Sequence, residues 1–182
     1  MSKITVWTKQ HRAVLEQLEA TGRYTATRSG ILTSEEAQLK MTCYNWLAQA
    51  MPQQHRPPDA EYPIWVCLSG EHAMLPSANA VILELEVDSD LMTPINEAKW
   101  GTIANFSYIP MNPQDDVRHS RMLDSYGISD AKAVMTPFYP AVRQEVIASW
   151  NRLFDPDVRL GSSYCDGVLW EVRKEWIRSI RK

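Results

Sequence analysis

Hydrophobic and polar positions near the start of the chain have first the pattern of a strand and then that of a helix. Residues 4–7 form a short β-branched and aromatic run, which predicts a strand. Apolar residues then recur at helical spacing over residues 14–18, and Gly22 stands where a helix commonly ends. We therefore predict a strand, a helix that ends at Gly22, and a second strand over residues 23–27.

The next stretch has the pattern of a long helix followed by a loop. Thr33 or Ser34, each shortly before a pair of glutamates, is typical of a helix N-terminus. The apolar residues from there to Ala50 lie on one side of that helix, and Pro52 bounds it. Residues 53–63 contain two consecutive prolines and few apolar groups, which predicts an irregular connection.

Two strands are predicted after this loop. Residues 62–68 are a compact apolar run, and residues 81–87 alternate between two faces. The alternation directs Val81 and the odd-numbered residues after it toward the core. Ile82 shares the opposite face with Glu84 and Glu86, a carboxylate pair that is either solvated or part of a cleft.

Helical spacing returns in the second half of the chain. A first helix is predicted to open at Pro94 and Asn96 and to cover residues 98–104. A second begins at Asp115 and stops at Gly127, and a third covers residues 140–154. The last segment, residues 168–180, fits either a strand that turns into a helix or one helix throughout.

These elements predict the fold class. The sequence contains no internal repeat, low-complexity tract or break in composition. We therefore expect residues 1–182 to form a single compact α+β domain, in which several helices pack on a small mixed or antiparallel sheet.

Composition and charge exclude several classes of protein. With 182 residues, of which 45% are hydrophobic, the chain can bury a core without disulfides or a structural metal. Its net charge of -3 provides no general field for nucleic acid or an anionic membrane. Three scattered cysteines and the lack of any long apolar run favour a cytoplasmic protein with no membrane segment.

No familiar catalytic or phosphate-binding motif is present. Of the four histidines, His119 alone lies near carboxylates, on the helical face of Asp115 and Asp116. This trio fits a metal site or an acid–base pair, but acidic residues in a first helical turn are explained more simply by the helix dipole. We therefore expect no metal.

Seven tryptophans are the most distinctive feature of the composition. Each one is by itself most simply a core residue. Trp65 and Trp100 lie beside polar residues that can orient a planar ligand, and Asn105 and Tyr108 add polar groups one turn later, where they can also serve simply as helix caps. We expect these four residues to line a cleft.

Spaced aromatic and proline residues give the chain a family resemblance. It resembles, over nearly its whole length, a bacterial domain-of-unknown-function family numbered thirty-eight forty-one, which implies no established activity. In place of the family's Gln-Ala before the final Trp-Glu, this chain has Cys165-Asp166-Gly167. The matching segments are Trp7-Thr-Lys-Gln10, Tyr44-x-Trp46-Leu47, Tyr62-Pro-Ile-Trp65, Lys99-Trp100-Gly101 with Asn105 and Tyr108-Ile-Pro110, Asp115-Asp116, Leu169-Trp170-Glu171 and Trp176-x-Arg178.

The order of the first elements also resembles, topologically, the opening of ADP-ribosyltransferases, which use NAD as substrate. That resemblance implies a glycosyltransferase in which Glu171 is the catalytic carboxylate. Alternatively, Glu171 is merely an exposed carboxylate between two core residues, and Glu84 or Glu86 is the functional acid. The implied NAD-binding residues are Thr8 or Gln10 for the ribose, Arg28 for the pyrophosphate, and Tyr24 or Trp65 for the ring.

A non-enzymatic recognition domain is the alternative function. In this interpretation the tryptophan cleft binds a small nucleotide, a peptide or a protein partner, with Asp115 and Asp116 at its polar rim. Basic residues near the C-terminus favour an anionic partner, although nucleic acid is not preferred. These residues are Arg173, Lys174, Arg178, Arg181 and Lys182.

Overall fold

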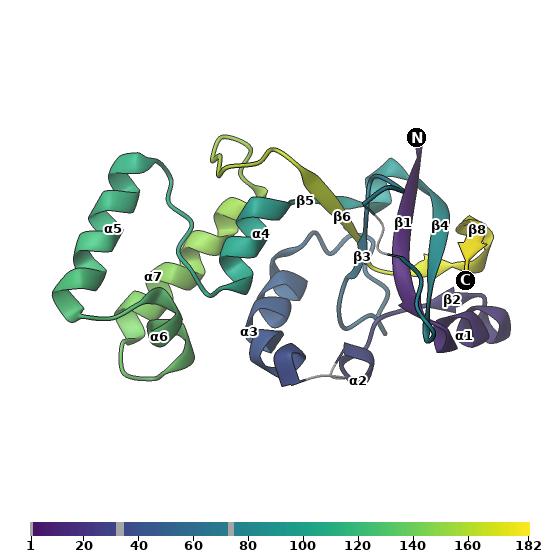
Figure 1. The fold of residues 1–182 in the computed structure, drawn as a ribbon, viewed down its shortest axis with the longest axis horizontal. Coiled ribbons are helices and arrows are strands. Elements are labelled where there is room, and N and C mark those ends of the chain that lie inside the picture. The colour runs from purple at the N-terminus through teal and green to yellow at the C-terminus, as the bar shows by residue number, and fades with distance from the viewer. Residues whose placement is uncertain (1, 32–34, 73–74) are drawn as a thin grey trace. The chain divides into compact units, whose positions relative to one another are not determined.

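The computed structural model describes residues 2–31, 35–72 and 75–182, and Figure 1 shows its helices and strands. The helices are α1 (Ala13–Thr21), α2 (Arg28–Ile31), α3 (Glu35–Ala50), α4 (Glu97–Ala104), α5 (Pro113–Tyr126), α6 (Asp130–Met135) and α7 (Pro140–Ser149). The strands are β1 (Lys3–His11), β2 (Arg23–Tyr24), β3 (Ile64–Val66), β4 (Ala80–Asp88), β5 (Thr93–Asn96), β6 (Cys165–Leu169), β7 (Val172–Arg173) and β8 (Ile177–Arg181). Three 3-10 turns complete the described chain: η1 (Ser89–Leu91), η2 (Trp150–Phe154) and η3 (Lys174–Trp176). The predicted α+β class is confirmed.

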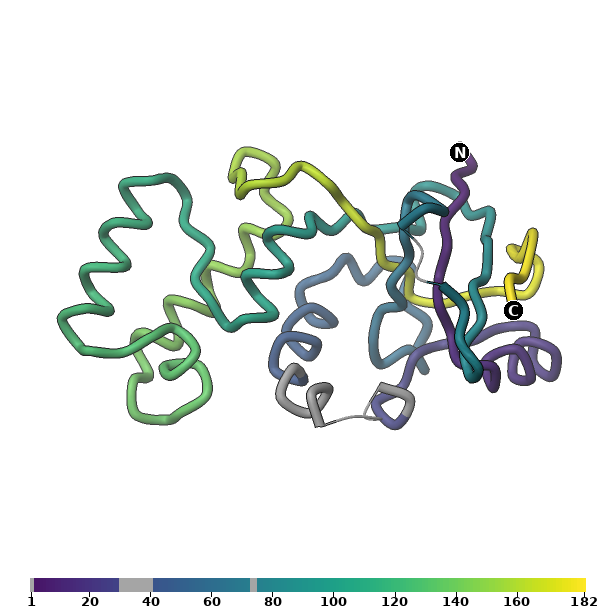
Figure 2. The backbone as a smooth tube through the Cα atoms, viewed as in Figure 1, coloured from purple at the N-terminus to yellow at the C-terminus, as the bar shows by residue number. Residues whose placement is uncertain are grey.

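Backbone contacts divide the chain into two compact units. Unit 1 comprises residues 1–94 and 165–182, and unit 2 comprises residues 95–164. The backbone enters unit 2 within β5 and returns to unit 1 at the start of β6. Its path can be followed in Figure 2. The expected single domain over residues 1–182 stays a prediction.

The first sheet of unit 1 has the order β1-β4-β8, and both of its pairings are antiparallel. Its central strand alternates as predicted, because Val81, Leu83, Leu85 and Val87 are fully buried. Ile82 is buried as well, so the opposite face of β4 is also covered at this end.

The other sheets of unit 1 are smaller. β2 pairs with β7, and the third sheet has the order β3-β6-β5. Reciprocal backbone hydrogen bonds between Trp7 and Cys67, of 3.0 and 2.7 Å, connect β1 to the chain just after β3. The second strand is shorter than predicted: it covers Arg23–Tyr24, and Ala26 then forms an isolated bridge with Tyr62.

The C-terminal segment differs from both sequence-based alternatives. Instead of a helix, residues 165–181 form β6, β7, η3 and β8. The apolar residues of this segment fit a helical spacing, but β8 finds hydrogen-bonding partners along β4. Because these partners lie far away in the sequence, local periodicity does not reveal them.

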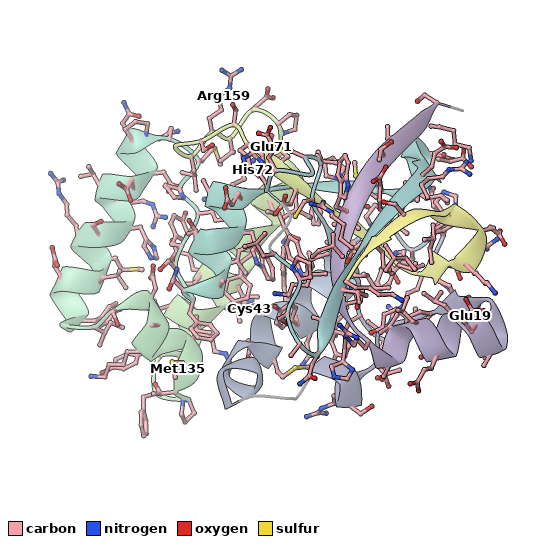
Figure 3. All side chains as sticks on the ribbon, turned by 45° about the vertical axis from the view of Figure 1, so that its right-hand side comes forward. Glu19, Cys43, Glu71, His72, Met135 and Arg159 are labelled. Carbon is pink, nitrogen blue, oxygen red and sulfur yellow. The ribbon has the colours of Figure 1, made fainter. Side chains whose placement is uncertain are left out.

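The helices of unit 1 largely follow the prediction. α1 ends at Gly22, whose φ of 77° is left-handed and whose N–H bonds to the carbonyl of Leu18. α3 ends at Ala50 and buries Cys43, which Figure 3 labels, together with Leu47. The predicted caps Thr33 and Ser34 lie outside the described residues.

Unit 2 is helical, and its core includes Ile103, Val146 and Trp150. Asn96 caps α4 as predicted, by accepting a hydrogen bond from the N–H of Lys99. α5 begins at Pro113 instead of Asp115. The side chain of Asn112 accepts a hydrogen bond from the N–H of Asp115 and so forms the N-terminal cap of the helix. It ends at Gly127 as predicted.

The remaining helical segments of unit 2 are a further correction. α6 was not predicted, since it spans six residues and is too short to repeat an apolar period. The helix expected over residues 140–154 is α7 followed by η2, where the backbone tightens at Trp150.

Candidate functional site

Unit 1 contains an open pocket with a volume of about 710 Å³, which we call the arginine pocket. Its basic residues come from β1, β2, β7, β8 and the loop after α3. They are Lys3, Arg23, Arg56, Arg173 and Arg178. Its acidic residues are Glu86, Asp88, Glu171 and Glu175. The lining therefore combines both signs of charge, with one more basic than acidic side chain.

Glu171 is the most buried carboxylate of the arginine pocket, with 8% of its surface exposed. It follows β6 and lies between Trp170 and Val172, which are both buried. One carboxylate oxygen accepts a hydrogen bond from Nε of Arg173 at 2.7 Å, and Nη2 of the same arginine forms an ion pair with it at 2.7 Å. The other oxygen is buried, lies 3.5 Å from Nη1 of Arg23, and has no hydrogen bond to any described residue. The alternative that Glu171 is an exposed carboxylate is therefore wrong.

Two arginines lie directly opposite each other at this carboxylate. The antiparallel register of β2 and β7 pairs Arg23 with Arg173. Like charges at such positions repel, and neighbouring carboxylates compensate: Asp59 lies 2.6 Å from Arg23, and Glu171 contacts both guanidinium groups. About half of each arginine side chain is still exposed, at 43% and 49%.

Arg56 adds a third positive charge, and its guanidinium is fixed in place. The guanidinium carbon lies 4.6 Å from the centre of the Trp170 ring, a cation–π contact. Its nitrogens also donate to backbone carbonyls, including that of Ala60 at 2.9 Å, and to Gln53. Among the described residues no carboxylate forms an ion pair with Arg56, so its charge is not neutralised locally.

The rim of the arginine pocket is formed by paired charges on the first sheet. Lys3 and Asp88 lie 3.0 Å apart, and Arg178 on β8 lies 2.5 Å from Glu86 on β4. The hydrogen bond from Arg178 holds the pKa of Glu86 below its ordinary value. Glu84 accepts a hydrogen bond from Ser179 at 2.7 Å. The predicted Glu84 and Glu86 pair is thus engaged by β8, and Glu86 alone of the two is among the lining residues.

The predicted ribose-binding residues are engaged with each other. The Thr8 hydroxyl is buried and donates to the backbone carbonyl of Trp65 at 2.7 Å. Gln10 in turn donates to the Thr8 hydroxyl at 2.7 Å. These contacts join β1 to β3.

The remaining predicted NAD contacts lie elsewhere in unit 1. Tyr24 is half-buried, and burial raises the pKa of its hydroxyl. The backbone N–H of Arg28 donates to Glu61. Of the predicted catalytic and NAD-binding residues in the described chain, Glu171 is the one that lines the arginine pocket. The roles of the others stay predictions.

The other predicted cleft residues lie in unit 2. Trp100 is half-buried on α4, and Asn105 ends that helix by donating to the carbonyl of Gly101 at 2.7 Å, so the capping interpretation of Asn105 is confirmed. The Tyr108 ring stacks on His119, with ring centres 3.8 Å apart. A cleft shared by these residues and Trp65 of unit 1 stays a prediction.

Asp115 is the centre of a polar network in unit 2. Burial opposes its ionisation, but hydrogen bonds from the Met111 N–H, Arg118 and the Tyr108 hydroxyl, with the charge of Arg152, lower its pKa to about 2. The lowered pKa is explained by these hydrogen bonds to the carboxylate. The helix dipole, which is the sequence-based interpretation of an acidic residue in the first turn, was therefore an incomplete explanation of Asp115. Asp116 is exposed in the same turn, as that interpretation predicts.

His119 contacts other carboxylates than those predicted. Its Nε2 lies 2.7 Å from Asp130, and its Nδ1 lies 3.4 Å from Glu145. The residue is almost fully buried and anchors α5 to the segments that carry these two acids. Within the described ranges, no group of three or more His, Cys, Asp or Glu residues could hold a metal ion.

Comparison with known proteins identifies a family. The model of a family described as a domain of unknown function (DUF3841) matches residues 5–178. No curated protein and no solved structure matches the chain, so the likeness to ADP-ribosyltransferases gains no support. Among the helices that the structure describes, none has the length and apolar character needed to cross a membrane.

Proposed function

Since the chain belongs to the DUF3841 family of domains of unknown function, we propose a function from the arginine pocket itself: unit 1 is a recognition module that binds a small phosphate-bearing molecule there. The observation that carries this proposal is the placement of Arg23 opposite Arg173 beside the buried Glu171. Carboxylates pair with both arginines, but about half of each arginine side chain stays exposed and can also bind an anion.

The chemistry of the arginine side chains supports an anionic ligand. A guanidinium presents its N–H groups in a planar fork that matches two phosphate oxygens. Glu171 engages Nε and Nη2 of Arg173, which fixes the orientation of the guanidinium while half of the side chain stays exposed. Arg56 contributes charge without a competing carboxylate partner among the described residues.

Binding of inorganic pyrophosphate and of ADP-ribose tests the proposal. Each probe should raise the melting temperature of the protein, because a ligand that binds only the folded state stabilises it. Arg173→Gln should weaken binding at least tenfold by calorimetry. Arg121→Gln, at an exposed position of α5 that does not line the pocket, makes the same charge change and should bind normally. No stabilisation by millimolar concentrations of either probe would refute the proposal.

Transfer of ADP-ribose from NAD is a second candidate function, favoured by the position of Glu171 in the arginine pocket. In this reaction the bond between the ribose carbon and nicotinamide breaks, and its electron pair leaves with nicotinamide. The acceptor then bonds to the ribose carbon and gives its proton to Glu171. The carboxylate also stabilises the positive charge that develops on the ribose.

Release of nicotinamide from NAD tests this second candidate. Glu171→Gln should abolish the release by removing the carboxylate. The same variant should retain its affinity for ADP-ribose within a few-fold if it stays folded, which thermal unfolding would check. If wild-type protein binds ADP-ribose but releases no nicotinamide in the presence of candidate acceptors, the recognition function stands alone.

A further inference from the structure

A second, smaller pocket adjoins the arginine pocket within unit 1. It has a volume of about 200 Å³, several times the roughly 30 Å³ that a water molecule occupies in the liquid. Its apolar walls are complemented by polar residues, so the lining is mixed. The apolar residues are Pro52, Leu91, Met92, Pro94 and Trp170, and the polar residues are Gln54, His55, Asp90 and Thr93. We call it the apolar pocket, after the first set.

The two pockets are neighbours, because they share lining residues along one edge. Gln54, His55 and Leu91 line both. A third, much smaller cavity of about 20 Å³ is also lined by His55 and Leu91, together with Glu171 and Trp170. His55 and Leu91 therefore lie at the border between the two larger pockets.

The walls of the apolar pocket are held in place before any ligand binds. The Trp170 indole N–H donates to the carbonyl of Pro52 at 3.0 Å, and Arg56 lies against the same ring. Met92 packs closely on Gly167, where an added Cβ would lie 2.4 Å from the methionine sulfur. Rigid walls reduce the entropy lost on binding, as in other preformed ligand sites.

We propose that the apolar pocket is the ring subsite of the ligand that the arginine pocket binds, so that the ligand is a nucleotide. Its phosphates lie beside Arg23 and Arg173, and its base lies against the half-buried Leu91 and Met92. Apolar walls suit the face of a base, and Gln54 and His55 at the shared edge offer hydrogen bonds to its polar rim. This inference rests on the proposed function, because it assigns the phosphates to the arginine pocket.

Calorimetric titration with matched probes tests the ring subsite. The probes are ADP, GDP, CDP and UDP, inorganic pyrophosphate as the ligand without a base, and adenosine as the ligand without phosphate. We expect at least one nucleotide to bind ten times more tightly than pyrophosphate. Equal binding of pyrophosphate and all four nucleotides, weakened alike by Arg173→Gln, would overturn the ring subsite but leave the proposed function intact.

Two variants separate the pockets. Thr93→Trp places a bulky side chain at the lining of the apolar pocket, and Met92→Ala removes an apolar side chain that does not line the arginine pocket. Each should reduce nucleotide affinity toward that of pyrophosphate and leave pyrophosphate binding unchanged. Unchanged nucleotide affinity in folded Met92→Ala and Thr93→Trp proteins would overturn the inference. Failure of every probe to bind the wild type would refute the proposed function and the ring subsite with it.

Discussion

A single carboxylate in unit 2 shows how strongly local hydrogen bonds act on one residue. The ordinary pKa of an aspartate is 3.8, and that of Asp115 is lowered to about 2. A carboxyl group whose pKa is lower in the folded state contributes stability above its unfolded pKa, and this stability is lost as the pH falls through the folded value. For Asp115 the contribution is roughly 2 kcal/mol.

Asp115→Asn should therefore be less stable than the wild type at neutral pH. The difference should shrink between about pH 4 and about pH 2, because the wild-type carboxylate becomes protonated there. Urea denaturation over this range would measure it. Asp116→Asn, an exposed neighbour in the same turn, should change stability by less than about 1 kcal/mol. A difference for Asp115→Asn that does not depend on pH would contradict the prediction.

The candidate site was only partly predictable at the residue scale. Glu171 was selected because the order of the first elements resembles that of ADP-ribosyltransferases. Only the fold shows that it is buried in a pocket. Arg23 was not selected, and Arg173 was seen only as one of several terminal basic residues. What brings the two arginines together is the pairing of β2 with β7. Neither strand has enough residues for a sequence pattern to predict that pairing.

At the scale of the element, two glycines in helical surroundings have opposite roles. Gly22 ends α1 with a left-handed φ of 77°, and a Cβ there would meet no atom within 4 Å. Gly101 lies inside α4, and a Cβ there would also meet nothing. Both positions have room for a Cβ, so the two glycines differ in backbone conformation and not in the space around them.

Gly22→Ala should destabilise the protein by about 1 kcal/mol, because an L-residue is strained at that φ. Gly101→Ala should stabilise it by up to about 1 kcal/mol, since alanine favours the helix interior. Thermal or urea unfolding of the two variants beside the wild type provides the measurement, and each serves as the control for the other. Equal effects would show that the cap geometry at Gly22 is not what ends α1.

Long, strongly patterned elements were predictable, and short or paired ones were not. β4 alternates between buried and partly exposed positions, and Gly22 and Gly127 end their helices as expected. The helix predicted within residues 168–180 was wrong, because a few apolar residues fit two periods. The choice between strand and helix there is made by hydrogen bonds to β2, β3 and β4, which are tertiary interactions.

At the scale of the whole molecule, unit 2 is a continuous segment within a discontinuous unit 1. The ends of unit 2 are adjacent, since the N–H of Glu97 donates to the carbonyl of Tyr164 at 3.1 Å. No change in composition marks either boundary, so the sequence predicted the α+β class but not this division. Adjacent ends are typical of segments that tolerate insertion into, or excision from, another unit.

Residues 95–164 should fold when expressed alone, because this segment contains its own core and its ends are already paired. The expected result is a helical circular dichroism spectrum and a cooperative thermal transition. Trp150→Ala is the control: Trp150 is fully buried, and its loss should cost about 3–5 kcal/mol and unfold the small segment. A random-coil spectrum for the unmodified segment would contradict independent folding and favour the single-domain prediction.

The position of Glu171, Arg173 and Arg178 after unit 2 in the sequence has a consequence for biosynthesis. A ribosome translates residues 2–94 and then all of unit 2 before it reaches β7 and β8. β1 and β4 can pair early, but until β7 and β8 emerge β4 lacks its second neighbour and the arginine pocket lacks Glu171. A translation product that ends before residue 165 therefore lacks Glu171, Arg173 and Arg178, although it contains the pocket residues of β1, β2 and β4.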